Sequence, residues 1–320
     1  MWFLCALFST IAWGCADLFY KKGADENDKY SHLKTSMIVG FIMGGHAIAT
    51  LLISGIEYNP VNLLNYFPVS AMYILSMTVG YFGLRYLELS ISSPIQNSSG
   101  AVCCILCLVL LGQTMDILSA TAVILICLGV VFLGLLEHLE LKKERASLPD
   151  KDKAADEKYR IGLVAFLMPI LYAVIDALGT FMDAYYLDDY TNTPLVGVTE
   201  ETIEDVANIS YELTFLICAV LILIFLMMNR KNTTAVVLKE GTTKARIFAA
   251  VFETAGQATY VYAMSGNGVV AAPMIASYSI VSLLLSRIFL KEKLSKWQYI
   301  AVTIVIIGIG LLGVVEGLAE

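Results

Sequence analysis

Charged side chains are scarce in this sequence. Asp, Glu, Lys and Arg make up 15% of the 320 residues, while hydrophobic residues make up 58%. Soluble domains carry about 25% charged and 45–50% apolar residues, so a soluble fold is excluded. Apolar runs of about 20 residues recur, and this is the length that crosses a hydrocarbon core of ~30 Å. We predict an all-α integral membrane protein with ten spans, at residues 2–19, 35–55, 66–87, 92–112, 118–137, 161–186, 206–228, 246–265, 268–290 and 297–315.

Motifs of catalysis and of nucleotide hydrolysis are also missing. The sequence has no Gly-x-x-x-x-Gly-Lys-Ser/Thr loop, no nucleophile–base pair and no strong metal-ligand spacing. All seven cysteines fall within predicted helices, which argues against a disulfide framework and is typical of helix packing. A soft metal at the cluster Cys103-Cys104-x-x-Cys107 is the less favoured interpretation. We therefore expect no enzymatic activity, no cofactor and no bound metal.

Lysine and arginine are absent from half of the predicted loops. All 21 lie in loops 20–34, 88–91, 138–160, 229–245 and 291–296 or at the helix ends beside them, and none lies in the alternate loops or at the termini. Cytoplasmic loops carry the Lys/Arg excess. We therefore predict a multi-pass protein of the cell (inner) membrane with these loops in the cytoplasm and both termini outside. The formal net charge of -7 combines an acidic outer face with a mixed inner face, so no nucleic-acid partner is predicted.

The sequence contains an internal repeat. A shift of 179 residues pairs the last three helices of each half, and a shift of 159 pairs the first helices. The predicted organisation is a first five-helix repeat at 1–137, a charged cytoplasmic linker at 138–160 and a second repeat at 161–320. Because five is odd, the second repeat enters the membrane with inverted polarity, as in many secondary transporters that alternate access to a central site. The matched pairs are Tyr81 with Tyr260, Pro94 with Pro273, Ser98 with Ser277, Gly129 with Gly308, Trp13 with Tyr172, and Asp17 with Asp176.

Short motifs in both halves resemble a known family. They are the Trp13-Gly14 step, the small-small-Pro sequences Ser92-Ser93-Pro94 and Ala271-Ala272-Pro273, and the hinges that begin at Leu111-Gly112 and Leu290-Lys291. With these motifs the chain is similar to the drug/metabolite transporter superfamily, specifically its EamA-type ten-helix members. The resemblance implies secondary transport of a small organic solute such as an amine, an amino acid or a drug-like metabolite. It also implies a central cavity surrounded by helices 1, 3, 4, 6, 8 and 9, with helices 5 and 10 at the periphery.

Acidic residues inside the spans are the first candidates for the chemistry of transport. An ionisable side chain at the centre of a membrane helix costs at least ~2.5–3.5 kcal/mol, and no Lys or Arg lies at that depth to neutralise one. For Asp17 the competing interpretation is an interfacial carboxylate near Lys21. Asp183 is expected to be solvated near the outer end. The predicted solute-binding residues are Asp17, Tyr81, Gln96, Asn97, Asp176, Glu253, Gln257, Tyr260 and Tyr278.

Two further polar groups lie in predicted spans. Glu212 is expected to be more peripheral, and His46 to serve packing or an interhelical hydrogen bond. The uncompensated carboxylates favour a cationic or zwitterionic solute, to which tyrosine faces would add cation–π contacts. Proton-coupled transport of a neutral metabolite and a non-transporting membrane protein stay open as alternatives, as does a homodimeric assembly.

Overall fold

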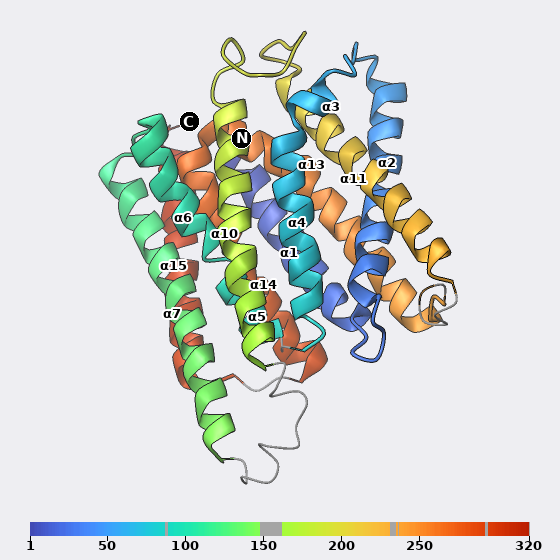
Figure 1. Cartoon of the computed structure of the whole chain (residues 1–320). Coiled ribbons are helices and arrows are strands. Elements are labelled where there is room, and N and C mark those ends of the chain that lie inside the picture. The colour runs from blue at the N-terminus through green and yellow to red at the C-terminus, as the bar shows by residue number, and fades with distance from the viewer. Residues whose placement is uncertain (87–88, 148–161, 231–234, 236, 292–293, 320) are drawn as a thin grey trace.

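A computed structural model describes residues 1–86, 89–147, 162–230, 235, 237–291 and 294–319, and contains helices but no strand within these ranges. The first half consists of α1 (Trp2–Gly23), α2 (Ser31–Ser54), α3 (Asn62–Asn65), α4 (Phe67–Gly83), α5 (Leu89–Gln96), α6 (Ser99–Leu106), the π-helical segment η1 (Cys107–Leu111) and α7 (Ile117–Ser147). The second half consists of α10 (Gly162–Leu187), α11 (Ile203–Met228), α13 (Glu240–Ala276), α14 (Tyr278–Leu285), the π-helical segment η2 (Ser286–Leu290) and α15 (Lys296–Ala319). Figure 1 shows them as one helical bundle.

The ten predicted spans are confirmed. Among the described residues, seven helical segments are long and apolar enough to cross a membrane, and two shorter apolar helices, Phe67–Gly83 and Ser99–Leu111, accompany them. One of the seven, Glu240–Leu290, is 51 residues long. It is interrupted at Asn267, whose φ of −166° and ψ of 72° are not helical. This segment therefore contains two spans, which meet at the turn predicted near Asn267.

The fourth and ninth spans, predicted as continuous helices, are each broken near the middle. At the first break the Ser98 hydroxyl donates to the Ile95 carbonyl at 2.8 Å, and at the second the Ser277 hydroxyl donates to the Met274 carbonyl at 2.5 Å. The backbone N–H of each serine bonds to the same carbonyl. A serine that bonds back to the preceding turn competes with the helical ladder. Because Ser98 and Ser277 are repeat partners, both halves of the molecule are broken at the same place.

The repeat extends to the end of each broken span. The π-helical segments η1 and η2 are related by the shift of 179 residues, and each is followed by a residue in the left-handed conformation. That residue is Gly112 in the first half, with φ of 65°, and Lys291 in the second, with φ of 60°. The two halves therefore share backbone geometry even where their side chains differ.

A close crossing of α7 and α15 relates the two repeats by an approximate two-fold axis. The two helices pack against each other at one edge of the bundle (Figure 1). A Cβ added to Gly129 would lie 3.2 Å from the Ala301 carbonyl oxygen, and one added to Gly308 would lie 2.9 Å from the Ala122 carbonyl oxygen. The shift of 179 residues exchanges these two contacts, as a two-fold axis requires. Beyond the predicted span, α7 continues through Ser147, so residues 138–147 of the predicted linker are helical and the rest of it lies outside the described residues.

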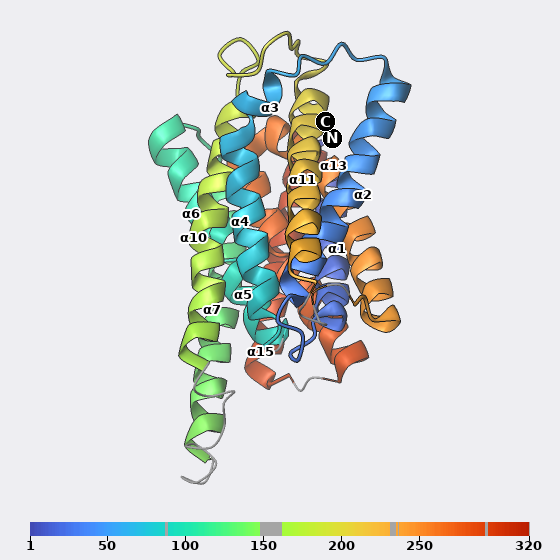
Figure 2. The same cartoon turned by 45° about the vertical axis from the view of Figure 1, so that its right-hand side comes forward.

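The loops alternate between two ends of the bundle. Both termini lie at the same end as α3 and the loop at residues 188–202, whereas the loop that follows α1 lies at the opposite end (Figure 1 and Figure 2). At that opposite end Arg85 donates to the carbonyls of Asp25, Glu26 and Lys29. We call this the basic end. The alternation agrees with the predicted arrangement of loops, and the assignment of the basic end to the cytoplasm stays a prediction.

Candidate solute-binding site

A polar cavity lies at the centre of the bundle. Its free space is about 60 Å³, which holds only a few water molecules, so an organic solute would require the walls to separate. Helices α1, α4, α10 and α13 supply most of the wall, and α5, α11 and α14 each contribute one side chain. The lining residues are Trp13, Asp17, Tyr20, Tyr73, Met77, Gly80, Tyr81, Leu84, Gln96, Tyr172, Asp176, Thr180, Tyr211, Glu253, Gln257, Tyr260 and Tyr278.

Two helix pairs face each other across this cavity. Helix α1 packs along α13, and α4 packs along α10. In each pair a large aromatic ring lies on a glycine of the other helix. A Cβ on Gly256 would lie 2.4 Å from Trp13, and one on Gly80 would lie 2.9 Å from Tyr172. Trp13 and Tyr172 are repeat partners, so the two pairs are equivalent halves of the site.

Asp17 is buried between the broken helices. Its carboxylate accepts hydrogen bonds from Ser93 of α5 at 2.6 Å and from Ser282 of α14 at 2.7 Å. Lys21 instead donates to the backbone carbonyl of Leu84 at 2.9 Å. Asp17 is 7% exposed and is thus buried within the bundle, and its depth relative to the membrane interface stays a prediction.

Asp176 occupies the equivalent position in the second half. It accepts a hydrogen bond from Ser99 of α6 at 2.7 Å and a longer one from Ser76 of α4 at 3.5 Å. Ser99 begins the second part of one broken span, and Ser282 lies in the second part of the other. Each aspartate is therefore bonded to the broken helix of the opposite repeat. Through these hydrogen bonds, each carboxylate of the cavity connects the two repeats.

Glu253 is the third carboxylate of the cavity wall. It is buried in α13 and accepts a hydrogen bond from the Tyr20 hydroxyl at 3.1 Å. One turn further on, the side-chain amide nitrogen of Gln257 has no hydrogen-bond partner among the described residues, and the same holds for that of Gln96. The wall thus offers acceptors on its carboxylates and unused donors on its two amides. Such a set matches a solute that carries both kinds of polar group.

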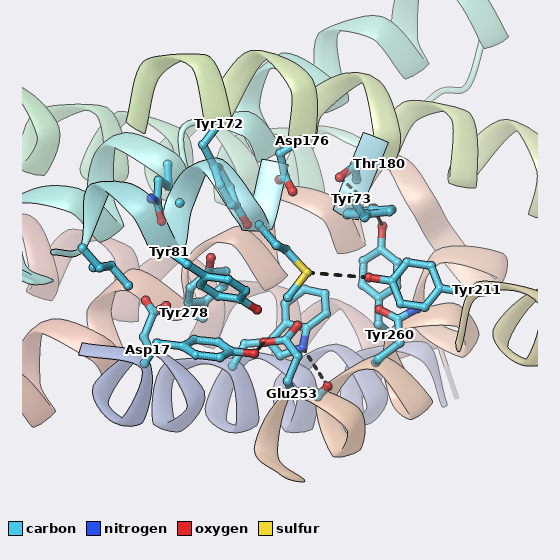
Figure 3. Close-up of a pocket in the computed structure, with 17 residues that line it drawn as sticks. Asp17, Tyr73, Tyr81, Tyr172, Asp176, Thr180, Tyr211, Glu253, Tyr260 and Tyr278 are labelled. Atoms are coloured by element: carbon cyan, nitrogen blue, oxygen red, sulfur yellow. Dashed lines mark hydrogen bonds between the residues drawn. The ribbon is translucent and has the colours of Figure 1, made fainter. Parts of the chain in front are cut away.

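Aromatic rings form much of the remaining wall (Figure 3). The ring of Trp13 lies 5.1 Å from that of Tyr260 and 5.9 Å from that of Tyr278, measured between centroids. At one end of the cavity the hydroxyls of Tyr73 and Tyr260 are 2.7 Å apart, and at the other the rings of Tyr20 and Tyr81 are 4.5 Å apart. Among the described lining residues three are carboxylates and none is Lys, Arg or His.

Eight of the nine predicted solute-binding residues lie in this wall, and their binding of solute stays a prediction. The exception is Asn97, which is buried at the break and donates to Ser93 at 3.1 Å. The prediction missed Tyr20, Tyr73, Thr180 and Tyr211, and the last of these adds helix 7 to the predicted set of helices. Helical spacing could have found two of them, because Tyr20 follows Asp17 by three residues and Tyr73 precedes Tyr81 by eight, so each shares a face with a predicted residue.

Two other buried acids lie outside the cavity wall. Asp183 was expected to be solvated, but its side chain is 1% exposed and accepts a hydrogen bond from Tyr66. Glu212 is fully buried, and one of its carboxylate oxygens lies 2.8 Å from Nδ1 of His46. This contact joins α11 to α2, which agrees with the interhelical hydrogen bond expected of His46.

Ten helices in two inverted repeats around a polar cavity define a membrane transporter of small solutes. The sequence model of the EamA-like transporter family matches residues 1–135 and 211–314, and the chain belongs to this family. A solved structure described as "Crystal structure of protein" aligns with 99% of this chain and 98% of its own chain, with a TM-score of 0.64. At 13% sequence identity this likeness shows the fold alone. Among curated proteins, none matches the sequence.

Proposed function

We propose that the protein is a secondary transporter of a small organic cation or zwitterion, such as an amine, an amino acid or a drug-like metabolite. The observation that carries this proposal is the set of three carboxylates, Asp17, Asp176 and Glu253, in one cavity whose described wall has no cationic side chain. Buried charges need partners, because desolvation without one is costly. Hydroxyls bond to all three carboxylates. A solute ammonium would supply the charge that the wall lacks.

The aromatic wall supports the same class of solute. A cation over the face of Trp or Tyr gains about 0.5–2 kcal/mol, with the larger values in desolvated sites. The rings of Trp13, Tyr260 and Tyr278 adjoin the carboxylates in the same cavity. The unused amide donors of Gln96 and Gln257 suit a carboxylate or hydroxyl on the other part of the solute. An anion without an ammonium group would meet three carboxylates and no guanidinium.

The inverted repeat supports alternating access as the mechanism of movement. The helix pairs α1–α13 and α4–α10 are equivalent by the repeat, so exchanging their environments opens the cavity to the opposite face. The sequence has no phosphate-binding loop for nucleotide hydrolysis. The energy for transport then comes from a gradient of protons, of another solute or of the substrate itself.

Binding by charge-neutralised variants tests the proposal. Asp176→Asn and Glu253→Gln are expected to weaken the binding of an organic cation by about 30-fold or more, because loss of one partner of a buried charge pair costs 2–5 kcal/mol. The measurement is a thermal-shift screen of amines, amino acids and nucleosides on purified protein, followed by calorimetric titration of the hits. Asp183→Asn is the matched control, since Asp183 is a carboxylate at least as deeply buried as these two and lies outside the cavity wall.

Two results would redirect this assignment. Tight binding of a nucleotide-sugar or a phosphorylated metabolite by the wild type would show that the proposal of a cationic or zwitterionic solute is wrong. If both variants keep their affinity and lose only its pH dependence, the carboxylates carry protons and the solute is neutral. Uptake into liposomes with an imposed proton gradient distinguishes this second case directly.

A further inference from the structure

Contacts between the two helix pairs lie towards both ends of the cavity. Towards the basic end, the ring of Tyr20 in α1 lies 4.5 Å from the ring of Tyr81 in α4, and Lys21 donates to the Leu84 carbonyl at 2.9 Å. At the opposite end the hydroxyl of Tyr73 in α4 lies 2.7 Å from that of Tyr260 in α13. Figure 3 shows Tyr81 and Tyr73 on opposite sides of Asp176 and Glu253. We call the two contacts the Tyr81 closure and the Tyr260 closure.

One member of each closure is related to the other by the repeat. Tyr81 and Tyr260 are repeat partners, separated by 179 residues, and both belong to the third helix of their half. Each reaches across the cavity to an aromatic side chain of the other helix pair. Tyr20 meets Tyr81 from α1, and Tyr73 meets Tyr260 from α4. An inverted-repeat transporter requires an equivalent barrier on each side of its site, because the repeat operation converts one access state into the other.

Packing within each helix pair is tighter than packing between the pairs. Trp13 on Gly256 and Tyr172 on Gly80 bring backbone and ring into direct contact, where even a methyl group would not fit. Among the described residues, the contacts that define the closures are a tilted ring contact, one hydroxyl pair and one lysine bonded to a backbone carbonyl. The ring contact and the hydroxyl pair are neutral and contribute little individually, and the bond from the lysine ammonium is a single charge-assisted hydrogen bond. The pairs are therefore suited to move as units, and the closures are the contacts that break.

We propose that the Tyr81 and Tyr260 closures are the two gates of the cavity, and that they open in turn as α1–α13 rocks against α4–α10. This assignment rests on the proposed transport function and deepens it. It gives Tyr20, Tyr73, Tyr81 and Tyr260 a role that is separate from contact with the solute. Opening one gate while the other stays closed exposes the carboxylates to one face of the membrane at a time.

Accessibility of a cysteine in the cavity tests the gates without any solute. The reporter is Gln257→Cys in a chain whose seven native cysteines are replaced by alanine. In the part of the chain that the structure describes, the side-chain amide nitrogen of Gln257 has no partner to lose. A membrane-impermeant maleimide is added to either face of sealed vesicles, and the labelling rate is measured. Tyr73→Phe removes the hydroxyl bond across the Tyr260 closure and also the bond from the same hydroxyl to Thr180, which lies within the α4–α10 pair. Only the first of these bonds joins the two pairs, so labelling is expected to rise about fivefold from the face with the termini only, as expected for loss of one ordinary hydrogen bond across the closure.

The Tyr81 closure is tested from the other face. Tyr81→Leu removes the ring contact, and Lys21→Met removes the bond to the Leu84 carbonyl, so one of the two suffices if the other does not fold. Each is expected to raise labelling from the basic end only. Tyr211→Phe is the matched control, because Tyr211 lines the same cavity but its hydroxyl contacts Met77 at 4.0 Å and not Tyr260 or Tyr81.

The outcomes separate the gates from the transport function. Labelling that rises equally from both faces, or a rise in Tyr211→Phe as large as in Tyr73→Phe, would overturn the gates. If the wild type binds cations but none of the variants changes the labelling rate, the proposed function is retained and the assignment of the gates is wrong. One-sided labelling in a protein that binds no cation supports the gates and refutes the choice of solute.

Discussion

At the scale of single residues, serine hydroxyls form the hydrogen bonds that stabilise the carboxylates of the two aspartates in the cavity. Ser93, Ser99 and Ser282 donate to the aspartates of the cavity, and each comes from a broken span. The sequence could indicate the aspartates, because acids within apolar runs stand out. It could not indicate their partners, because periodicity identifies the face of a helix but not which other helix lies against it. Asn97 shows the same limit, since the chain turns at that position and directs it to Ser93.

A residue-scale prediction concerns the loop at the basic end. Lys239 donates to the carboxylate of Asp25, and this contact lowers the pKa of Asp25 from its ordinary value. A lowered pKa in the folded state gives stability that is present above the unfolded pKa of about 3.9 and is lost as the pH falls through the folded value. Lys239→Met is therefore expected to lower the free energy of unfolding at pH 7 by at most about 1 kcal/mol, because Lys239 is largely exposed.

Thermal unfolding in detergent at several pH values measures this effect. The difference between wild type and Lys239→Met should shrink below about pH 4. Lys244→Met is a suitable control, because Lys244 pairs within its own helix with Glu240, and both side chains are exposed. A difference that persists unchanged at pH 3 would contradict an origin in the Asp25 contact.

At the scale of elements, the sequence predicts where helices cross the membrane but not where they break. The ten spans follow from hydropathy and from the placement of Lys and Arg, which are properties of long segments. The breaks depend on Ser98 and Ser277, each four residues after a proline and each bonded to the carbonyl three residues back. The internal repeat aligns the two proline–serine pairs, Pro94 with Ser98 and Pro273 with Ser277, in the sequence. That the helices break at these serines could be seen only from the backbone conformation, because Ser in an apolar helix is also common where helices pack closely.

An element-scale prediction concerns the turns after the broken spans. Gly112 and Lys291 adopt the same left-handed conformation, which costs about 1–2 kcal/mol for a residue other than glycine. Lys291→Gly is expected to stabilise the protein by about 0.5–1 kcal/mol, since the greater freedom of glycine in the unfolded chain offsets part of the gain. Gly112→Ala is expected to destabilise it by about 1 kcal/mol or more. No atom of the described residues lies within 4 Å of a Cβ at Gly112, so the measured change reports the backbone alone.

Unfolding midpoints of the two variants in the same detergent provide the measurement. Opposite signs at repeat-related positions are the expected pattern. Equal destabilisation by both changes would mean that Lys291 contributes side-chain interactions that outweigh its conformation.

At the scale of the whole molecule, the prediction concerns orientation. The loops at the basic end should face the cytoplasm, and both termini should face the other side, because Lys and Arg are retained on the cytoplasmic face. A reporter that fluoresces only in the cytoplasm should stay dark at the C-terminus and fluoresce when fused after Ser147, at the end of α7. Fluorescence at the C-terminus would reverse the orientation and with it the assignment of each gate to a face.

The inverted arrangement of the two halves has a consequence for biosynthesis. The basic residues of the first half and those of the second lie in loops at one end of the molecule, although the halves enter the membrane in opposite directions. Orientation during insertion is set by Lys and Arg close to the spans. Each half therefore contains its own Lys and Arg residues that set its orientation. Neither half needs the other to be inserted in the correct direction. Assembly of the transporter is then a docking of two separately inserted halves, with close contacts at Gly129 and Gly308 between α7 and α15 and at Gly80 and Gly256 within the two helix pairs.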